Sequence, residues 1–497
     1  MPLQSAFACL TLFFLLVCSV TGRVASAERP NILWFIVDDM SANFGCYGET
    51  AIATPAVDAL AQRGMKFTRA FVTAPVCSTC RSAFITGMYQ TSIGAHHHRS
   101  GRGEVKLRLP AGVRPIPELF QDAGYYTTCS GWPVREDRLG KTDYNFEWDP
   151  SMYDGADWGY RQPGQPFFAQ IHVPGGKLRG ASLDQYEKIA RQAESLFGAR
   201  TPDALVRLPP YYPPHPVIVR DWAAYLDSVR ITDHVFGQVI ARLEQDGELD
   251  NTLVVFMTDH GISHARGKQF LYDEGIHVPL VVAGPGIAPG TVREDLVEHI
   301  DIAALSLAAA GIPVPDWMQA RDILAEDYRP REAVFAARDR CDETVDHIRC
   351  VRTQRYKYIR NYLPHRPLLQ PNAYKDHKAI LQALREAGRN NQLDAVQAQL
   401  LAPQRPPEEL YDLAEDPHEI HNLAQSPEHA KTLESMRKLL TQWEASSGDR
   451  GRQPEPWVVY DSDMRVYLDA LQRRNPDRLQ EVQQNIALMK QWAMEGK

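Results

Sequence analysis

The sequence has few cysteines, no surplus of positive charge and a single long apolar run. Eight cysteines in 497 residues are too few for a disulfide scaffold, so the fold has to depend on an apolar core. The net charge of −8 offers no broad basic surface, which argues against nucleic acid or an anionic membrane surface as a partner. An anionic ligand would instead need a local cluster of positive groups.

The one long apolar run lies between Ala6 and Val20 and is followed by Ala25-Ser26-Ala27. This pattern predicts a signal peptide over residues 1–27 and hence a secreted or periplasmic protein. No Lys or Arg precedes the run, so a short buried helix is the alternative interpretation. No other segment approaches the roughly 20 apolar residues that span a bilayer, so we expect no membrane span.

Several segments of the first 330 residues have the continuous apolar character of strands buried on both faces of a parallel sheet. They are residues 31–39, 166–173, 252–261 and 278–286. A helical pattern over roughly residues 219–248 precedes the third of them. Because helices alternate with buried strands, we predict a large, doubly wound, mostly parallel α/β domain over residues 28–330.

The pattern changes after residue 330. Residues 348–363 are typical of two strands with alternating polar side chains, which predicts a sheet with one solvated face. Helical patterns follow over residues 365–407, near residues 428–446 and after Pro456. We therefore predict a smaller α+β domain over residues 331–497 that ends in a helical tail.

Acidic residues follow two of the buried strands. Asp38 and Asp39 come after the first strand, and Asp259 with His260 after the third. Sites in such sheets form beyond the carboxyl ends of the strands, so we expect these side chains to meet. Carboxylates suit a hard cation, whereas imidazole suits zinc or another transition metal better. A polar turn is the plainer interpretation of either acidic pair alone.

Two cysteines stand three residues apart, Cys77 and Cys80, with Arg81 directly after them. Their spacing is compatible with a redox pair, half of a zinc site or a structural disulfide. No second pair of ligands at zinc spacing is present, which counts against zinc. Arg81 could lower a thiol pKa, which keeps the redox pair open. The histidines at 96–98 are interpreted as solvated.

Residues 77–81 read CSTCR and are followed by SAFITG. This stretch resembles the C-x-P-x-R signature of the sulfatase family of the alkaline-phosphatase-like fold. Other landmarks of that family stand in the same order along the chain: PNILWFIVDD, IATPAVDALAQRG, TDHG, GK, VPLVV and ELYDLAEDPHEIHNLA. The resemblance covers nearly the whole mature length and is greatest to the heparan N-sulfatase (sulfamidase) branch. It implies hydrolysis of a sulfate ester or sulfamate on a sugar or polysaccharide, N-sulfoglucosamine among them.

The resemblance also implies the chemistry of the site. Cys77 would be oxidised to formylglycine (3-oxoalanine) by a formylglycine-generating enzyme, and the hydrated aldehyde would attack sulfur and later expel sulfate. A divalent metal, foremost Ca²⁺, would withdraw charge from the sulfuryl group. The matching metal ligands are Asp38, Asp39, Asp259 and His260, the last of which is usually asparagine in this family.

Further catalytic roles come from the same resemblance. Arg81 matches the arginine that holds the formylglycine, and Lys268 matches a residue that contacts the sulfate. Lys141, within Gly140-Lys141-Thr142-Asp143, is expected to contact the sulfate or the nucleophile. Lys177 stands where the family has a leaving-group histidine, so we expect it to contact sulfate or, with a depressed pKa, to donate a proton.

Departures from the family pattern leave alternatives open. Thr79 replaces the proline of the signature, and Asp143 and Lys177 stand where the family has histidines. Cys80, at a variable position of the signature, adds a thiol that could trap Cys77 as a disulfide. Because such a chain could escape oxidation, a catalytically inactive protein that binds sulfated glycans is one alternative. A phosphomonoester or phosphodiester hydrolase on the same fold is another, since both esters present a tetrahedral anion to a metal-assisted nucleophile.

Overall fold

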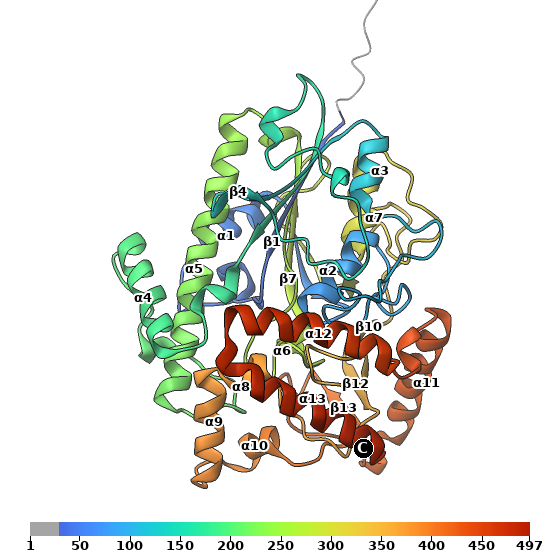
Figure 1. The fold of residues 1–497 in the computed structure, drawn as a ribbon. Coiled ribbons are helices and arrows are strands. Elements are labelled where there is room, and N and C mark those ends of the chain that lie inside the picture. Colours follow the sequence, from blue (N-terminus) through green and yellow to red (C-terminus); the bar gives the residue numbers. More distant parts are fainter. Residues whose placement is uncertain (1–28) are drawn as a thin grey trace, which may run out of the picture.

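The computed structural model describes residues 29–497, so the predicted signal peptide lies outside the described residues. The strands of this part form one sheet of nine strands and one of four (Figure 1). The large sheet contains β1 (Asn31–Val37), β2 (Met65–Phe71), β3 (Tyr126–Gly131), β4 (Arg135–Leu139), β5 (Phe167–Val173), β6 (Thr252–Thr258), β7 (His277–Ala283), β8 (Thr291–Arg293) and β9 (Val297–Glu298). The small sheet contains β10 (Val334–Arg338), β11 (Ile348–Arg352), β12 (Tyr356–Asn361) and β13 (Glu408–Asp412).

The large sheet has the order β4-β3-β5-β1-β6-β7-β2-β8, and β9 also pairs with β2. The strands β3, β5, β1 and β6 run parallel to one another. β7 is antiparallel to both of its neighbours, β6 and β2. The predicted α/β fold with a mostly parallel sheet is confirmed, and β1 and β6 lie side by side at its centre.

Strand β1 shows why its sequence is apolar throughout. All seven of its residues are buried. Trp34 packs edge-on against Phe84 on one face of the sheet, with ring centroids 5.9 Å apart. The next residue, Phe35, contacts Phe236 on the opposite face at 5.0 Å. Successive side chains of a strand point to opposite faces, so only a continuous apolar run satisfies a strand covered on both sides.

Helices cover both faces of the large sheet (Figure 1). Phe84 belongs to α2, and Phe236 belongs to α5, which lies against α1 and α4. On the other face, α2 packs against α3 and α7. These helices are α1 (Pro55–Arg63), α2 (Cys77–Thr86), α3 (Ile116–Asp122), α4 (Leu183–Phe197), α5 (Pro216–Gln245) and α7 (Asp301–Ala309), with the short α6 (Asp273–Ile276) before β7.

Local sequence explains where the main helices begin and end. Proline occupies the first position of α1 and α5, where its missing N–H costs nothing. Helix α2 ends at Gly87, whose φ of 63° is the left-handed conformation common at helix ends. All ten residues of α2 are buried, so the CSTCR stretch lies inside the protein.

The C-terminal part contains the four-stranded antiparallel sheet and the remaining helices. These are α8 (Ala373–Asp376), α9 (Ala379–Arg389), α10 (Ala395–Ala398), α11 (Ala430–Ser446), α12 (Trp457–Arg474) and α13 (Leu479–Met494). The predicted division of the chain after residue 330 falls in the loop between α7 and β10. Within residues 29–497, no helix combines the length and the apolar character that crossing a membrane requires.

The expectation of one solvated sheet face in this part is wrong, because every residue of β11 is buried. Trp443 of α11 stacks on Phe335 of β10, with ring centroids 5.1 Å apart. On the other face, Lys357 of β12 reaches Asp273 of α6, with an Nζ to Oδ1 distance of 2.6 Å. The sheet is thus packed between α11 and the large domain.

The alternating polar residues of this sheet, which suggested a solvated face, form buried ion pairs. The guanidinium of Arg349 has no exposed surface and pairs with Asp449 at 2.6 Å and with Asp339 at 3.2 Å. Lys357, also fully buried, has a second partner in Glu419 at 2.6 Å. A buried charge is tolerated when it is paired and hydrogen-bonded, so alternating polar residues need not face water.

Replacing Arg349 by methionine should destabilise the protein. The change leaves Asp339 and Asp449 buried without a counter-charge, and we expect the free energy of unfolding in urea to fall by about 3–5 kcal/mol. Arg465→Met is the matched control, since Arg465 is 63% exposed and pairs with the exposed Glu104. The control should cost at most about 1 kcal/mol. Equal losses in the two variants would contradict the structural role given to Arg349.

Candidate active site

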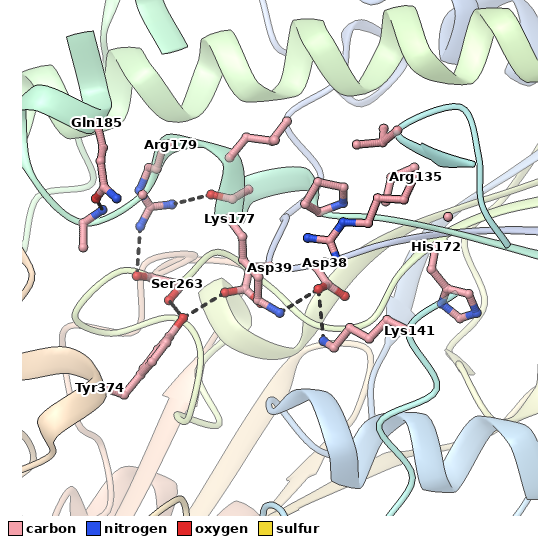
Figure 2. A pocket seen from close by; sticks show the side chains of 18 of the residues that line it. Asp38, Asp39, Arg135, Lys141, His172, Lys177, Arg179, Gln185, Ser263 and Tyr374 are labelled. Carbon is pink, nitrogen blue, oxygen red and sulfur yellow. Dashed lines mark hydrogen bonds and ion pairs between the residues drawn. The ribbon is translucent and has the colours of Figure 1, made fainter. Parts of the chain in front are cut away.

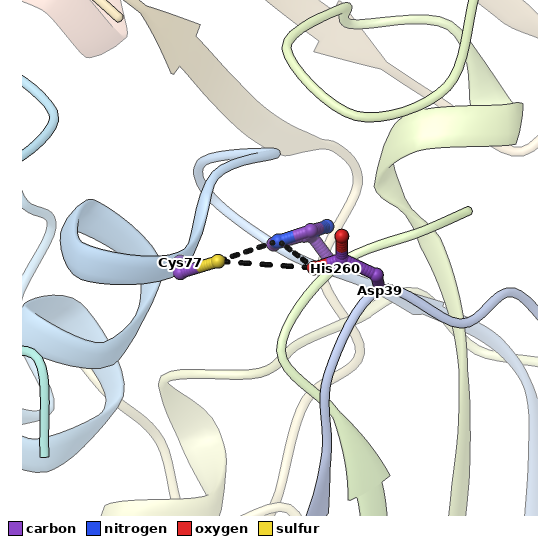
Figure 3. A group of neighbouring side chains, drawn as sticks. All are labelled: Asp39, Cys77 and His260. Atoms are coloured by element: carbon purple, nitrogen blue, oxygen red, sulfur yellow. Dashed lines mark hydrogen bonds and ion pairs between the residues drawn. The ribbon is translucent and has the colours of Figure 1, made fainter. Parts of the chain in front are cut away.

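The carboxyl ends of β1 and β6 carry the acidic residues to one point. Asp38 and Asp39 follow β1, and Asp259 and His260 follow β6, which pairs with β1 in parallel register. The backbone N–H of Asp39 donates to Asp259 Oδ1 at 3.1 Å. Cys77, the first residue of α2, faces the same point (Figure 3). The sequence prediction that these side chains meet is therefore correct in its geometry.

Asp39 has an unusual backbone conformation at this point. Its φ of 54° is left-handed, a region that aspartate tolerates better than most residues. The carbonyl oxygen of Asp39 lies against Gly176, where a Cβ atom would collide with it. Glycine at 176 therefore allows the 3₁₀ helix η4 (Gly175–Arg179), which carries Lys177, to approach the end of β1 closely.

The Cys77 thiol is surrounded by charged groups. Its Sγ atom lies 3.2 Å from His260 Nε2 and 3.8 Å from Asp39 Oδ1. The ammonium groups of Lys177 and Lys268 each lie 3.3 Å from the same sulfur. Cys77 is only 3% exposed. Bulk water therefore screens the electrostatic interactions of its sulfur less than it would at the surface.

Arg81 fixes the relative positions of these groups. Its guanidinium is fully buried and pairs with Asp38 and with Asp259, the latter at 3.1 Å from Nε. It also lies 2.6 Å from His172 Nδ1 and donates to the carbonyl oxygen of Lys141 at 2.8 Å. A guanidinium only donates, so His172 accepts at Nδ1 and carries its proton on Nε2.

Two lysines bridge from the cavity to Asp38 (Figure 2). Lys177 Nζ lies 2.6 Å and Lys141 Nζ 3.0 Å from Asp38 Oδ2. Burial by itself would lower the pKa of Lys177, but Asp38 and Asp39 raise it well above its ordinary value. The depressed pKa considered for proton donation is therefore not found, and Lys177 is placed as a fixed cation.

Asp143, at the position where the family has a histidine, belongs to a separate ion pair. Its carboxylate pairs with Arg102 at 2.5 Å and lies 3.6 Å from Lys141. Burial alone would raise the pKa of Asp143, but Lys141 and Arg102 hold it well below its usual range. It therefore stays ionised, as befits a group that orients Lys141 rather than one that transfers a proton.

The donor set fits a divalent cation. Ligand atoms of Asp39, Cys77 and His260 all lie within 4.8 Å of one another. Burial, together with Asp38 and Cys77, raises the pKa of Asp259 to about 6, although the neighbouring His260 and Arg81 oppose this shift. His260 Nδ1 faces the carbonyl oxygen of Gly261 at 2.9 Å. Since a carbonyl only accepts, Nδ1 holds the proton and Nε2 is free to bind a metal.

A cavity of about 1010 Å³ opens above this centre. Its wall includes Asp38, Asp39, Lys141 and Lys177, whereas Cys77 lies one layer beneath them. The wall also includes Arg135 of the β3–β4 hairpin and residues 176–182. The mouth is thus lined by loops from different strands of the sheet, as is usual for open α/β folds.

The family model for sulfatases matches residues 30–312. The chain belongs to the sulfatase family. A second family model, the C-terminal region of N-sulphoglucosamine sulphohydrolase, matches residues 260–401. Members of the family are sulfuric ester hydrolases, so this chain is an enzyme of that class.

Two curated relatives have substrates in their names. An ulvan-active sulfatase of Formosa agariphila is 32% identical over 471 residues, which cover 87% of this sulfatase and 77% of the relative. Human N-sulphoglucosamine sulphohydrolase is 27% identical over 480 residues, covering 87% and 92% of the two chains. The predicted likeness to the N-sulfatase branch is confirmed.

A solved structure with a bound ligand shares the fold. It is described as a complex of the enzyme with its substrate, D-glucosamine-2-N,6-O-disulfate. It superimposes with a TM-score of 0.58 at 18% sequence identity, over 85% of this sulfatase and 98% of that chain. The alkaline-phosphatase-like fold predicted from the sequence is confirmed by such neighbours.

Several residues of the site escaped the sequence analysis. Tyr374 of α8 donates from its hydroxyl to Asp39 Oδ2 at 3.2 Å and lies 3.1 Å from Ser263 Oγ (Figure 2). Lys378, four residues further on, also lines the cavity. These residues stand in a stretch with only a polar helical pattern, so no local signal marked them. Only the packing of α8 on the loop after β6 brings them to the site.

The histidines at 96–98 also differ from expectation. His98 is buried, not solvated, with 3% of its surface exposed. Its Nδ1 lies 2.7 Å from Ser78 Oγ, next to Cys77 in α2. Ser78 Oγ also accepts from the backbone N–H of Arg99 at 2.8 Å. This segment therefore anchors the first turn of α2.

The two cysteines of the CSTCR stretch are not paired with each other. All cysteines of the described part of the chain are free thiols. Cys80 Sγ turns away from Cys77 toward the carbonyl oxygen of Asp259 and lies 2.9 Å from His299 Nε2. Burial and Asp259 raise the pKa of Cys80 well above its ordinary value. The disulfide considered from the spacing is therefore not formed in this structure.

The unconverted, metal-free protein should contain one thiolate at neutral pH. Burial alone would raise the pKa of Cys77, but Lys141, Lys177 and Lys268 hold it well below its ordinary value of 9.0. The ultraviolet absorbance of the thiolate should persist as pH falls through neutrality, disappear in Cys77→Ser and remain in Cys80→Ser. A band that emerges only in alkaline solution would show that the three lysines do not stabilise the Cys77 anion.

Proposed function

We propose that this sulfatase removes sulfate from a sulfated saccharide, with Cys77 converted to formylglycine and a divalent metal at Asp38, Asp39, Asp259 and His260. The observation that supports the proposal best is the surroundings of Cys77. Its side chain lies beneath a wide cavity, within 3.3 Å of two ammonium groups and close to Asp39 and His260. An anionic group that undergoes nucleophilic attack needs such positive charge around it.

Each charged residue has a distinct part in the proposal. Lys177 and Lys268 lie beside the Cys77 side chain and would hold the sulfate oxygens. Lys141 bridges from the cavity to Asp38 and would hold the sulfate from the opposite side. Arg81 contacts Asp38 and Asp259 and would keep the acidic ligands and α2 in register. After conversion, the formylglycine at position 77 would supply the nucleophile, and a metal held by the acidic residues would supply a Lewis acid.

The substrate class follows from the relatives and from the cavity. The relatives above are named for ulvan and for N-sulphoglucosamine. A cavity of about 1010 Å³ is at the upper end of the size usual for small-molecule sites. A saccharide of one or two units would fit, and the proposal covers both sulfate esters and sulfamates.

Export and maturation are part of the same proposal. The apolar run between Ala6 and Val20 and the small residues at 25–27 support secretion or export to a periplasm. A formylglycine-generating enzyme would act on Cys77 before folding, because all of α2 is buried afterwards. The hydroxyl of Thr79 donates to the carbonyl oxygen of Val76 at 2.9 Å in the folded helix. Because this bond belongs to the folded state, it would not hinder an enzyme that oxidises Cys77 before folding.

Mass spectrometry and turnover together test the catalytic proposal. The peptide that contains Cys77 should show the mass of an aldehyde in place of the thiol. The converted protein should release sulfate from a sulfated saccharide and from an aryl sulfate. Cys77→Ala should lower kcat/KM by about three orders of magnitude or more, as loss of a covalent nucleophile does.

The alternatives predict different results in the same experiment. Faster turnover of aryl phosphate than of aryl sulfate would indicate a phosphoester hydrolase. An unmodified Cys77 in the exported protein, with saccharide binding but no turnover, would indicate a binding protein. Either result would refute the proposed sulfatase chemistry.

Metal removal should destabilise the folded protein. A ligand that binds only the folded state stabilises it by about 2.7 kcal/mol when its concentration is 100-fold above Kd. We therefore expect chelation to lower Tm and re-addition of a divalent ion to restore it. In Asp259→Asn the response of Tm to the ion should be much smaller. An equal response in both proteins would place the metal elsewhere.

A further inference from the structure

Lys378 is a buried cation in the wall of the cavity. Only 6% of its surface is exposed. Its ammonium group donates to the carbonyl oxygen of Ser263 at 3.1 Å and to the hydroxyl oxygen at 2.5 Å. A third, long contact of 3.5 Å joins it to the Tyr374 hydroxyl. Among the side chains that the structure describes, no carboxylate pairs with Lys378.

A buried ammonium group without a counter-charge is unfavourable. Hydrogen bonds to neutral oxygens replace only part of the lost hydration. Burial, followed by the nearby positive charge of Arg179, lowers the pKa of Lys378 well below its ordinary value. The nearest acidic side chains are already engaged, since Asp221 pairs with Arg179 at 3.1 Å and Asp39 pairs with Lys268 at 3.1 Å. The described part of the protein therefore supplies no counter-charge for the ammonium group of Lys378.

More cationic than acidic residues line the cavity, although the chain as a whole is acidic. The acidic residues described in its wall are Asp38 and Asp39, both of which contact lysines of the catalytic centre. A larger number of cationic residues lines it: Arg99, Arg135, Lys141, Lys177, Arg179 and Lys378. Lys141 and Lys177 pair with Asp38, Arg179 with Asp221 and Arg99 with Asp342. Lys378 has no such carboxylate among the described side chains, so the negative charge it needs has to come from the ligand.

We propose that Lys378 binds a second anionic group of the saccharide, a carboxylate or a further sulfate, while the scissile sulfate lies at Cys77. This inference rests on the proposed function, because it assumes that the cavity takes a sulfated saccharide. It names the substrate class as saccharides that carry at least one anionic group besides the sulfate to be removed. An anion would replace the long contact to Tyr374 and keep the two bonds to Ser263.

The geometry allows one small saccharide to reach both places. The Tyr374 hydroxyl lies 3.4 Å from Lys268 Nζ and 3.5 Å from Lys378 Nζ. Both ammonium groups also lie over the ring of Tyr374, at 4.7 and 4.5 Å from its centroid. A single phenol side chain thus separates the cation at the nucleophile from the cation at the proposed second position.

Binding measured without turnover tests the inference. The first probe is a disaccharide whose only charged group is one sulfate. The second has a uronate carboxylate added to the same framework, and the third has a second sulfate instead. Calorimetry uses Cys77→Ala protein, so the nucleophile does not consume the probes. Lys378→Met in this background should raise Kd about tenfold for one or both doubly anionic probes, as expected for a lost charge-assisted hydrogen bond. For the monosulfated probe the change should stay within about twofold.

The matched control is Lys188→Met, which removes an exposed lysine of α4 outside the cavity. It should change no Kd, and circular dichroism should show that both variants are folded. The probe that responds to Lys378→Met identifies the anion as carboxylate or sulfate. Equal effects of Lys378→Met on all three probes, or no effect on any, would overturn the inference. Failure of the proposed function would differ, because the converted wild-type enzyme would then release no sulfate from any probe.

Discussion

The buried guanidinium of Arg81 is the interaction on which the centre depends. It joins the ends of β1 and β6 through Asp38 and Asp259, and it joins β5 through His172. Because Arg81 lies one helical turn after Cys77 in α2, the same contacts fix the position of Cys77, the proposed precursor of the nucleophile. A planar group with several donors suits this task better than lysine, which would reach fewer partners. Without it, the buried Asp259 would lose its 3.1 Å ion pair, whereas Asp38 would keep Lys177 and Lys141 as partners.

Charge balance explains the arrangement around that anchor. Three carboxylates and the Cys77 side chain lie against Arg81 and a set of lysines, and the pKa of Asp259 is still raised to about 6. In the proposed site a cation would lie beside Asp259 and Nε2 of His260, and an anion would lie beside Lys177 and Lys268. The positive charge of the metal would balance the carboxylates, and the negative charge of the sulfate would balance the lysines.

The C-terminal part completes the site instead of merely covering the large domain. Tyr374 of α8 and Lys378, which directly precedes α9, both line the cavity, and Lys375 donates to the carbonyl oxygens of His264 and Ala265. Farther away, Lys357 of the small sheet pairs with Asp273 and Glu419 at 2.6 Å. These buried ion pairs hold the two parts in one arrangement, so cavity shape depends on residues more than 200 positions away from Cys77 along the chain.

The sequence by itself determined the central sheet and the inner part of the site. Apolar runs identify the buried strands, and acids at the strand ends must meet because parallel strands share one edge. The CSTCR stretch and its companion motifs determine the family. Tertiary structure alone decided that the small sheet is buried, because Arg349 and Lys357 have partners distant in sequence. It also decided the places of His98, Tyr374 and Lys378, because the sequence around these residues contains no motif that marks them as part of the site. Ion pairing and cavity lining are relations between distant segments, and local sequence does not record them.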